Sequence, residues 1–296
     1  MKRCPICKGA GREDRRVSGY VLLKCGDCGF VYVDAPDTEL LQANVHYDDS
    51  AKQRYDSVQG SSYHAWFAHV SRRLTQGRQG LRVLDIGCGN GMLLRHFQKL
   101  DCICFGSDPS PWARDCAEEY GYTLLGRIEE TEIEPASFDI ITSTSTLEHI
   151  PSPLEHVRRI VELLKPGGTA YFTVPNYGSL PLRLRLVKGR LVTPPGHCSY
   201  FTTRTLRNLF AQEGLKERVE NVRVRSYGIP EIHAVHRRLV RKKAKPAHPP
   251  GPGRTKAKRP WLSKAVVAAY YWSGTPFGLG DKLEAVVHKS TRPGTG

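Results

Sequence analysis

The feature that most constrains this chain is the stretch Leu81–Gly91, where an apolar run ends at Asp85 and three glycines then fall at alternate positions. The pattern predicts a buried strand that turns sharply into a helix beginning near Met92. Glycine permits positive φ in such a turn and lets a ligand come close, because it carries no Cβ. The free N–H groups at the start of the helix can then bind a polar or anionic ligand group.

The residues after the glycines favour a nucleotide-type ligand. A second strand is predicted at Cys102–Ser107 and ends at Asp108. An acid at the end of the second strand, about 20 residues after the glycines, binds ribose hydroxyls in α/β nucleotide sites. The glycines follow the pattern G-x-G-x-G, and Met92 stands where a dinucleotide fingerprint has its last glycine. This departure disfavours a nicotinamide or flavin cofactor.

Four motifs resemble, in order and spacing, those of class I S-adenosylmethionine-dependent methyltransferases. They are Val83–Gly91, Asp108, Phe138–Ile141 and Leu164–Gly168. The resemblance covers roughly residues 63–289. It implies an α/β fold with a Rossmann-like, doubly wound, seven-stranded sheet, S-adenosyl-L-methionine as the cofactor, and an enzyme that transfers methyl groups.

The resemblance also assigns roles to single residues. Asp108 is expected to accept hydrogen bonds from ribose hydroxyls, Ile128 to cover the adenine ring, and Leu147 or nearby backbone to face the methionine end. Many relatives carry Asp where Arg127 stands, so this sequence departs from the family at the adenine loop. The expected cofactor-binding residues are Asp85, Gly87, Cys88, Gly89, Gly91, Asp108, Ile128 and Leu147.

Two histidines are candidates for the base that removes a proton from the acceptor. His149 follows Glu148 at the carboxyl end of the fourth predicted strand. His197 lies in Pro195–Phe201, which is similar to a P-x-H-x-x-x-F stretch near the acceptor in relatives. A histidine with a pKa of about 6.5 can accept a proton at neutral pH. A purely structural role stays open for both.

Two CxxC pairs near the N-terminus predict a metal site. Cys4, Cys7, Cys25 and Cys28 can bring four thiolates around one tetrahedral Zn²⁺. Residues 1–34 are therefore predicted to form a small zinc ribbon with a structural role. This segment is too short for a core of its own, so the metal would supply the missing stability.

The rest of the chain divides by composition. Residues 35–62 are expected to be a linker that covers the cofactor, since His46–Asp49 matches a tyrosine-rich linker of zinc-ribbon relatives. Residues 63–236 are expected to form the methyltransferase core. Residues 237–260 are a basic insertion that is predicted to be disordered, and residues 261–296 hold a helix and the last core strand.

Apolar periodicity and helix-end signals predict the main elements of the core. A capping box is predicted at Ser152–Glu155, and the helix that it starts should stop at Pro166. The other predicted helices and strands are Tyr63–Gln76, Met92–Leu100, Pro111–Tyr120, Tyr122–Leu125, Phe138–Thr142, Thr169–Val174, Thr203–Glu213, Lys216–Arg225 and Lys282–His288.

The net charge of +15 favours an anionic partner. The basic insertion and the aromatic segment after it suit peripheral membrane contact through residues 237–272; a solvated loop and a packed helix are the alternative. The basic stretch Leu180–Val192 is either a substrate lid or an amphipathic strand. The sequence shows no signal peptide and no apolar run of the ~20 residues that span a bilayer, so we expect a cytoplasmic protein, with a peripheral position at the membrane as the alternative.

Three functions are compatible with this sequence. The first is methyl transfer to O or C of a small-molecule, saccharide or lipid-linked acceptor. The second is RNA methylation, with the zinc ribbon and the basic insertion holding phosphates. Against it, Ser143–Thr146 lacks the Asn/Asp-Pro-Pro-aromatic motif of enzymes that methylate exocyclic base amines. The third is a non-catalytic scaffold, which the intact glycine loop and Asp108 disfavour.

Overall fold

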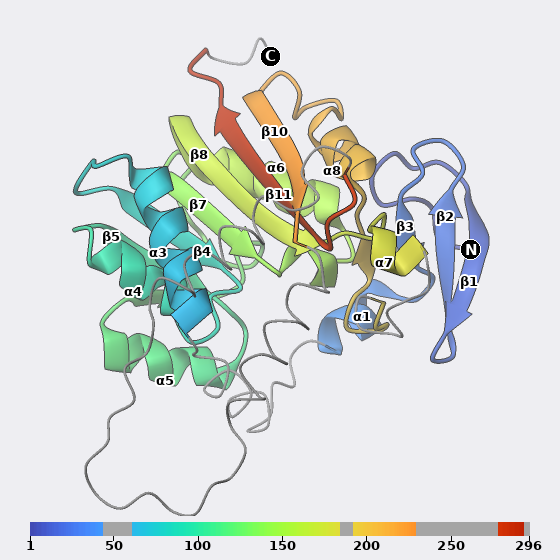
Figure 1. The fold of residues 1–296 in the computed structure, drawn as a ribbon, viewed down its shortest axis with the longest axis horizontal. Helices are drawn as coiled ribbons and strands as arrows, with labels where there is room; N and C mark the ends of the chain where they lie inside the picture. Colours follow the sequence, from blue (N-terminus) through green and yellow to red (C-terminus); the bar gives the residue numbers. More distant parts are fainter. Residues whose placement is uncertain (44–60, 184–191, 229–277, 293–296) are drawn as a thin grey trace, which may run out of the picture.

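The computed structural model describes residues 1–43, 61–183, 192–228 and 278–292. Within these residues it contains a seven-stranded sheet and a four-stranded sheet. In Figure 1 the small sheet lies at the right of the view, beyond α7 (Leu180–Arg183) and α8 (Thr203–Phe210). None of the helices in the described part is long and apolar enough to cross a bilayer.

The large sheet has the order β10-β11-β8-β7-β4-β5-β6. The five strands from β6 to β8 pair in parallel, whereas β11 runs antiparallel to both of its neighbours. This arrangement confirms the fold class expected from the sequence. The strands are β4 (Arg82–Ile86), β5 (Ile103–Ser107), β6 (Thr123–Leu125), β7 (Phe138–Thr144), β8 (Leu164–Pro175), β10 (Val219–Tyr227) and β11 (Lys282–Lys289).

Helices cover the sheet and explain why its central strands are apolar on both faces. All residues of β4 after Arg82 are buried. Helix α6 contributes Leu154, Val157, Ile160 and Val161 to the core at helical spacing. The remaining helices are α1 (Asp37–Gln42), α3 (Ser61–Thr75), α4 (Met92–Gln98), α5 (Pro111–Tyr120), α6 (Pro153–Leu163) and the single 3₁₀ turn η1 (Leu147–His149).

Two expectations at the ends of α6 are wrong. Ser152 makes no side-chain cap on this helix, so the predicted capping box is absent. Its hydroxyl donates instead to Asp37 Oδ2 at 3.0 Å, because α1 lies beside the start of α6. At the other end, β8 begins at Leu164, directly after α6, so the Pro-Gly-Gly sequence lies inside the strand and not in a turn before it.

The small sheet joins the N-terminal segment to a distant part of the chain. Its strands are β1 (Gly11–Val17), β2 (Tyr20–Cys25), β3 (Val31–Val33) and β9 (Ser199–Tyr200), in that order. Strand β3 pairs with β9, and the rings of Phe30 and Phe201 lie 5.0 Å apart. The N-terminal residues therefore share one sheet and one apolar cluster with residues that lie between β8 and β10 in the chain.

Several expectations fall on residues that the structure does not describe. These are most of the linker 35–62, the basic insertion 237–260, the aromatic segment 261–272 and most of the basic stretch 180–192. The predicted membrane and nucleic-acid contacts depend on these segments, so they stay predictions.

A buried carboxylate connects three elements of the large sheet to α3. Glu284 on β11 is 2% exposed and accepts hydrogen bonds from Arg73 Nη1 at 2.8 Å, Arg225 Nε at 2.8 Å and Tyr171 Oη at 2.9 Å. Burial by itself would raise the pKa of Glu284, but hydrogen bonds and charge from the two arginines lower it below its usual value. The ionised carboxylate is therefore the form that the fold stabilises.

We expect Glu284→Gln to reduce the free energy of unfolding by about 3 kcal/mol, because two guanidinium groups lose their buried counter-charge. Since the pKa of Glu284 is lowered, the loss should be full above the ordinary carboxyl pKa and shrink as the pH falls through the folded-state value. Urea unfolding of both proteins, at one pH above and one below the pKa of Glu284, measures this loss of unfolding free energy. Glu220→Gln, at an exposed position of β10, is the matched control. Equal stability of the two variants would contradict this role.

Candidate functional site

A cavity lies at the carboxyl ends of β4, β5 and β7, where open α/β sheets bind their ligands. It holds about 970 Å³ of space, part of it open to solvent. Three of its lining residues, Ile86, Ser107 and Thr144, are the last residues of these strands. The other lining residues are Leu41, Gly87, Gly89, Asp108, Pro109, Ser110, Trp112, Arg127, Ile128, Glu129, Ser145, Thr146, His149 and Ile150.

The glycine loop bends as the sequence predicts, and two of its glycines are sterically required. Gly87 has a φ of 71°, and a Cβ there would lie 2.2 Å from Thr146 Oγ1. Gly91 has a φ of 65°, and a Cβ there would lie 2.5 Å from the ring of Tyr122. Any larger side chain would push the loop away from the ends of the neighbouring strands. Gly91 is thus needed for packing although it does not line the cavity.

Asp108 faces the glycine loop from the end of β5. Its Oδ2 accepts a hydrogen bond from the Gly89 N–H at 2.9 Å. Its Oδ1 accepts from the Ser110 N–H at 2.9 Å and from the Ser110 hydroxyl at 2.6 Å. The carboxylate is thereby fixed in the cavity wall, and Oδ2 keeps a second lone pair for a ligand hydroxyl.

Three of the expected cofactor residues lie behind the cavity wall. Asp85 is 2% exposed and accepts from Thr142 Oγ1 at 2.7 Å. Burial, together with the charge of Asp108, raises the pKa of Asp85 to about 7 although the Thr142 hydrogen bond lowers it. Cys88 and Leu147 are buried as well, and burial raises the pKa of the Cys88 thiol. These residues support the loop and η1 from behind.

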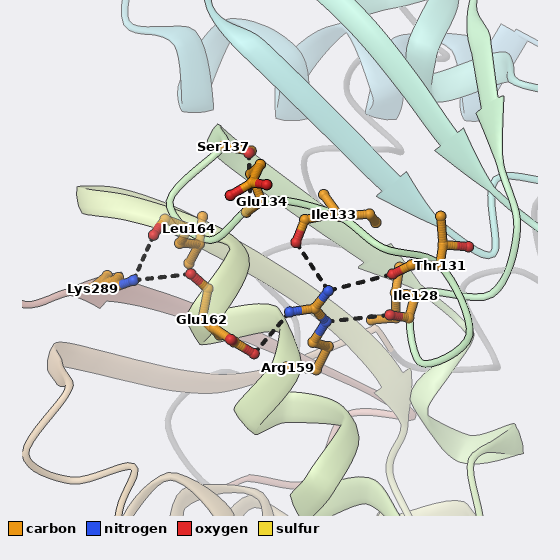
Figure 2. Close-up of polar contacts among 9 residues, drawn as sticks. All are labelled: Ile128, Thr131, Ile133, Glu134, Ser137, Arg159, Glu162, Leu164 and Lys289. Atoms are coloured by element: carbon orange, nitrogen blue, oxygen red, sulfur yellow. Dashed lines mark hydrogen bonds and ion pairs between the residues drawn. The ribbon is translucent and has the colours of Figure 1, made fainter.

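The loop over the expected adenine position is held by Arg159 on α6. As Figure 2 shows, its guanidinium donates to the carbonyl oxygens of Ile128 at 3.3 Å, Thr131 at 3.5 Å and Ile133 at 3.1 Å. Glu162 accepts from the same group at 2.9 Å and fixes its orientation. Ile128, which lines the cavity, therefore owes its place to a residue outside it.

The two candidate histidines lie together at one side of the cavity. Their ring centroids are 4.9 Å apart and the rings are nearly perpendicular. His149 lines the cavity and its Nδ1 donates to the Gly196 carbonyl at 2.7 Å, whereas His197 is not among the described lining residues. Burial lowers the pKa of His149.

The four N-terminal cysteines form one cluster, with all sulfur atoms within 4.8 Å of one another. Cys4 and Cys28 Sγ are 3.6 Å apart, and Cys7 and Cys25 Sγ are 3.4 Å apart, which excludes disulfides. Around a tetrahedral Zn²⁺ with bonds of about 2.3 Å, sulfur atoms lie roughly 3.8 Å apart, close to these distances.

The two cysteine pairs sit on equivalent turns. The carbonyl of Cys4 accepts from Lys8 N–H and that of Cys25 from Gly29 N–H, and both donors have positive φ. Each turn directs its two thiols toward the same point, as a closed tetrahedral site requires. The residues therefore fit a structural zinc ion.

Sequence reasoning missed several lining residues. Leu41 comes from α1, within the segment 35–62 that is expected to cover the cofactor, but no local pattern singles out this residue. Trp112 follows Asp108 by four positions and could have been inferred from its place in the first turn of α5. Thr146 was not singled out, because its role depends on Gly87 lying against it.

We expect Arg159→Ala to loosen the loop 126–133, because three backbone carbonyls lose their donor. Amide hydrogen exchange in that loop should rise at least tenfold, as an opening free energy lower by about 1.4 kcal/mol implies. Arg158→Ala is the control. Arg158 lies on the exposed side of the same helix and binds Glu155 and the Glu213 carbonyl, not the loop. The same exchange rates in both variants would contradict the assignment.

Comparison with known proteins places this geometry in a family. A family model described as a methyltransferase domain matches residues 53–218. Ubiquinone biosynthesis O-methyltransferase of Sodalis glossinidius is 37% identical over 108 residues, which are 34% of this chain and 43% of the relative. The enzyme of the same name from Vibrio cholerae is 37% identical over 109 residues, 34% of this chain and 44% of the relative. The chain thus spans less than half the length of these relatives.

Solved structures agree on the fold. A Thermotoga maritima S-adenosylmethionine-dependent methyltransferase, described as a possible histamine N-methyltransferase, matches with a TM-score of 0.52 at 16% identity, covering 86% of this chain and 100% of that chain. Haemonchus contortus phosphoethanolamine N-methyltransferase 2, in complex with S-adenosyl-L-methionine, matches with a TM-score of 0.57 at 17% identity, covering 87% and 60%. Identities this low show a shared fold alone.

The family model carries the assignment further than the single relatives, because it matches more than half of the 296 residues and includes the glycine loop, Asp108 and α6. The sequence-based expectation of the family is therefore confirmed, and this chain belongs to the methyltransferase domain family.

Proposed function

We propose that this chain is an S-adenosylmethionine-dependent methyltransferase that acts on an oxygen atom of a small-molecule acceptor. The observation that carries the proposal is the cavity at the ends of β4, β5 and β7, with Gly87, Gly89 and Asp108 in its wall. The curated relatives named O-methyltransferases support oxygen as the acceptor atom.

The cavity residues divide into a ribose end and an adenine end. One ribose hydroxyl can donate to the remaining lone pair of Asp108 Oδ2. A second one at Oδ1 would replace the Ser110 hydroxyl, which now donates there at 2.6 Å. Ile128 and Trp112 offer apolar surfaces to a flat ring. Glu129 and Arg127 leave polar groups at the edge of that ring.

S-adenosylmethionine supplies a methyl group on a positively charged sulfur, which an acceptor oxygen displaces in line. The chain has to align the acceptor, exclude water and take up its proton. His149 lies in the cavity wall, and its lowered pKa keeps it neutral and able to accept a proton near pH 7. His197, 4.9 Å away between ring centroids, is the second candidate for the base.

We expect Asp108→Ala to weaken binding of S-adenosylmethionine at least tenfold, or about 1.4 kcal/mol, because the ribose hydroxyls lose their acceptor. Isothermal titration calorimetry measures the affinity directly. Asp115→Ala removes the same charge from an exposed position of α5 and should bind as the wild type does. Unchanged affinity of the Asp108 variant would rule out the ribose assignment.

We also propose that Cys4, Cys7, Cys25 and Cys28 hold a structural Zn²⁺. The support is the fit of the sulfur distances and of the two equivalent turns to a closed tetrahedral site. Because β3 pairs with β9, the metal would also stabilise the segment that carries His197.

The double variant Cys4→Ser with Cys25→Ser should lose about one zinc per chain relative to the wild type, measured by inductively coupled plasma mass spectrometry. Its β1–β3 amides and those of residues 198–201 should exchange faster, since the two segments share a sheet. Cys102→Ser, outside the cluster, should keep the full zinc content. A double variant with wild-type zinc content would overturn the site.

A further inference from the structure

A second group of metal-ligating side chains lies beside the cavity and contains none of the N-terminal cysteines. Glu148, His149 and His197 each offer a ligand atom, and these atoms lie within 4.8 Å of one another. We propose that they form a binding site for one divalent transition-metal cation, open to the cavity on the side of His149.

The carboxylate of Glu148 is the first argument for a cation. Glu148 is 3% exposed, and its Oε2 has no hydrogen-bond partner among the described residues. A buried carboxylate oxygen without a donor is costly, and such groups are paired or coordinate a metal when they persist. The two imidazoles are the neighbours with which it can share a cation.

The orientation of His149 is the second argument. Its Nδ1 donates to the Gly196 carbonyl at 2.7 Å, so Nε2 is the nitrogen that can coordinate. A ring nitrogen that donates to a backbone carbonyl is the usual support of a metal-ligating histidine, because it fixes both tautomer and orientation.

Backbone and side-chain hydrogen bonds hold the segments that carry the three ligands together. The Cys198 N–H donates to the Glu148 carbonyl at 2.9 Å, and the Ser199 hydroxyl donates to the Ile150 carbonyl at 2.7 Å. These bonds attach the segment that carries His197 to η1 and the residue after it. Strand pairing between β3 and β9 holds the same segment on its other side. The site is therefore pre-organised, which lowers the entropic cost of binding.

The ligand set indicates which cations fit. Two imidazoles and one carboxylate suit Zn²⁺, Fe²⁺, Co²⁺ or Mn²⁺, and three protein ligands leave positions open for water or an acceptor atom. Ca²⁺ needs more oxygen ligands than this set provides, and Mg²⁺ prefers oxygen ligands over imidazole nitrogen.

A cation here would change the chemistry available to the cavity. It would bind an acceptor hydroxyl and lower its pKa, so that the hydroxyl proton can pass to water and neither histidine has to accept it. This role rests on the proposed function, whereas the existence of the site rests on the three side chains alone.

Cobalt separates the two metal sites. The full chain, prepared with one zinc per molecule, is dialysed to equilibrium against excess Co²⁺, and zinc and cobalt are counted by mass spectrometry. The wild type should bind about one Co²⁺ per chain and retain its thiol-bound zinc. Glu148→Gln and His197→Asn should each weaken cobalt binding at least tenfold without loss of zinc.

The control is the double variant Glu220→Gln with His288→Asn, which removes a carboxylate and an imidazole on β10 and β11 and should bind cobalt like the wild type. Wild-type protein that binds no cobalt, or ligand variants that bind it as tightly as the control, would overturn the site. S-adenosylhomocysteine binding is measured on the same samples. Absence of S-adenosylhomocysteine binding in samples that bind cobalt would contradict the proposed function but not the cation site.

Discussion

The turn between β4 and α4 is the contact on which the site depends. Gly87 and Gly91 both have positive φ and both lie so close to a neighbour, Thr146 and Tyr122 respectively, that a Cβ could not be added. Because the loop can approach so closely, the ends of β4, β5 and β7 meet around one cavity. Asp108 then accepts a hydrogen bond from the Gly89 N–H and closes one side of that cavity.

A second constraint joins the cysteine cluster to the other side of the same cavity. Strand β9 belongs to the small sheet through β3, and the residues just before it carry His197. The segment is also bonded to η1 through the Glu148 carbonyl. The N-terminal segment is thus tied, through β9, to the residues beside His149 in the cavity wall. A metal ion at the cysteines would therefore also stabilise the segment that carries His197.

Features with a local signature could be predicted from the sequence. The glycine loop, Asp108 and the cysteine pairs depend on spacing within short segments. The structure places Asp108 beside the glycine loop and the four cysteines beside one another. Features that form between segments far apart in the chain could not be predicted from the sequence. Strand β1 was missed because its residues GREDRRV are charged and mostly exposed, so no apolar alternation marks it. The bond from Ser152 to Asp37 replaced the expected capping box because no local pattern places α1 beside α6.

The most direct measurement of the central claim is a crystal structure of the full chain with S-adenosylhomocysteine bound. The account predicts the ribose hydroxyls on Asp108, the adenine ring between Ile128 and Trp112, and the sulfur atom on the side of His149. Ligand density at any other place, or a ligand whose ribose does not contact Asp108, would contradict it.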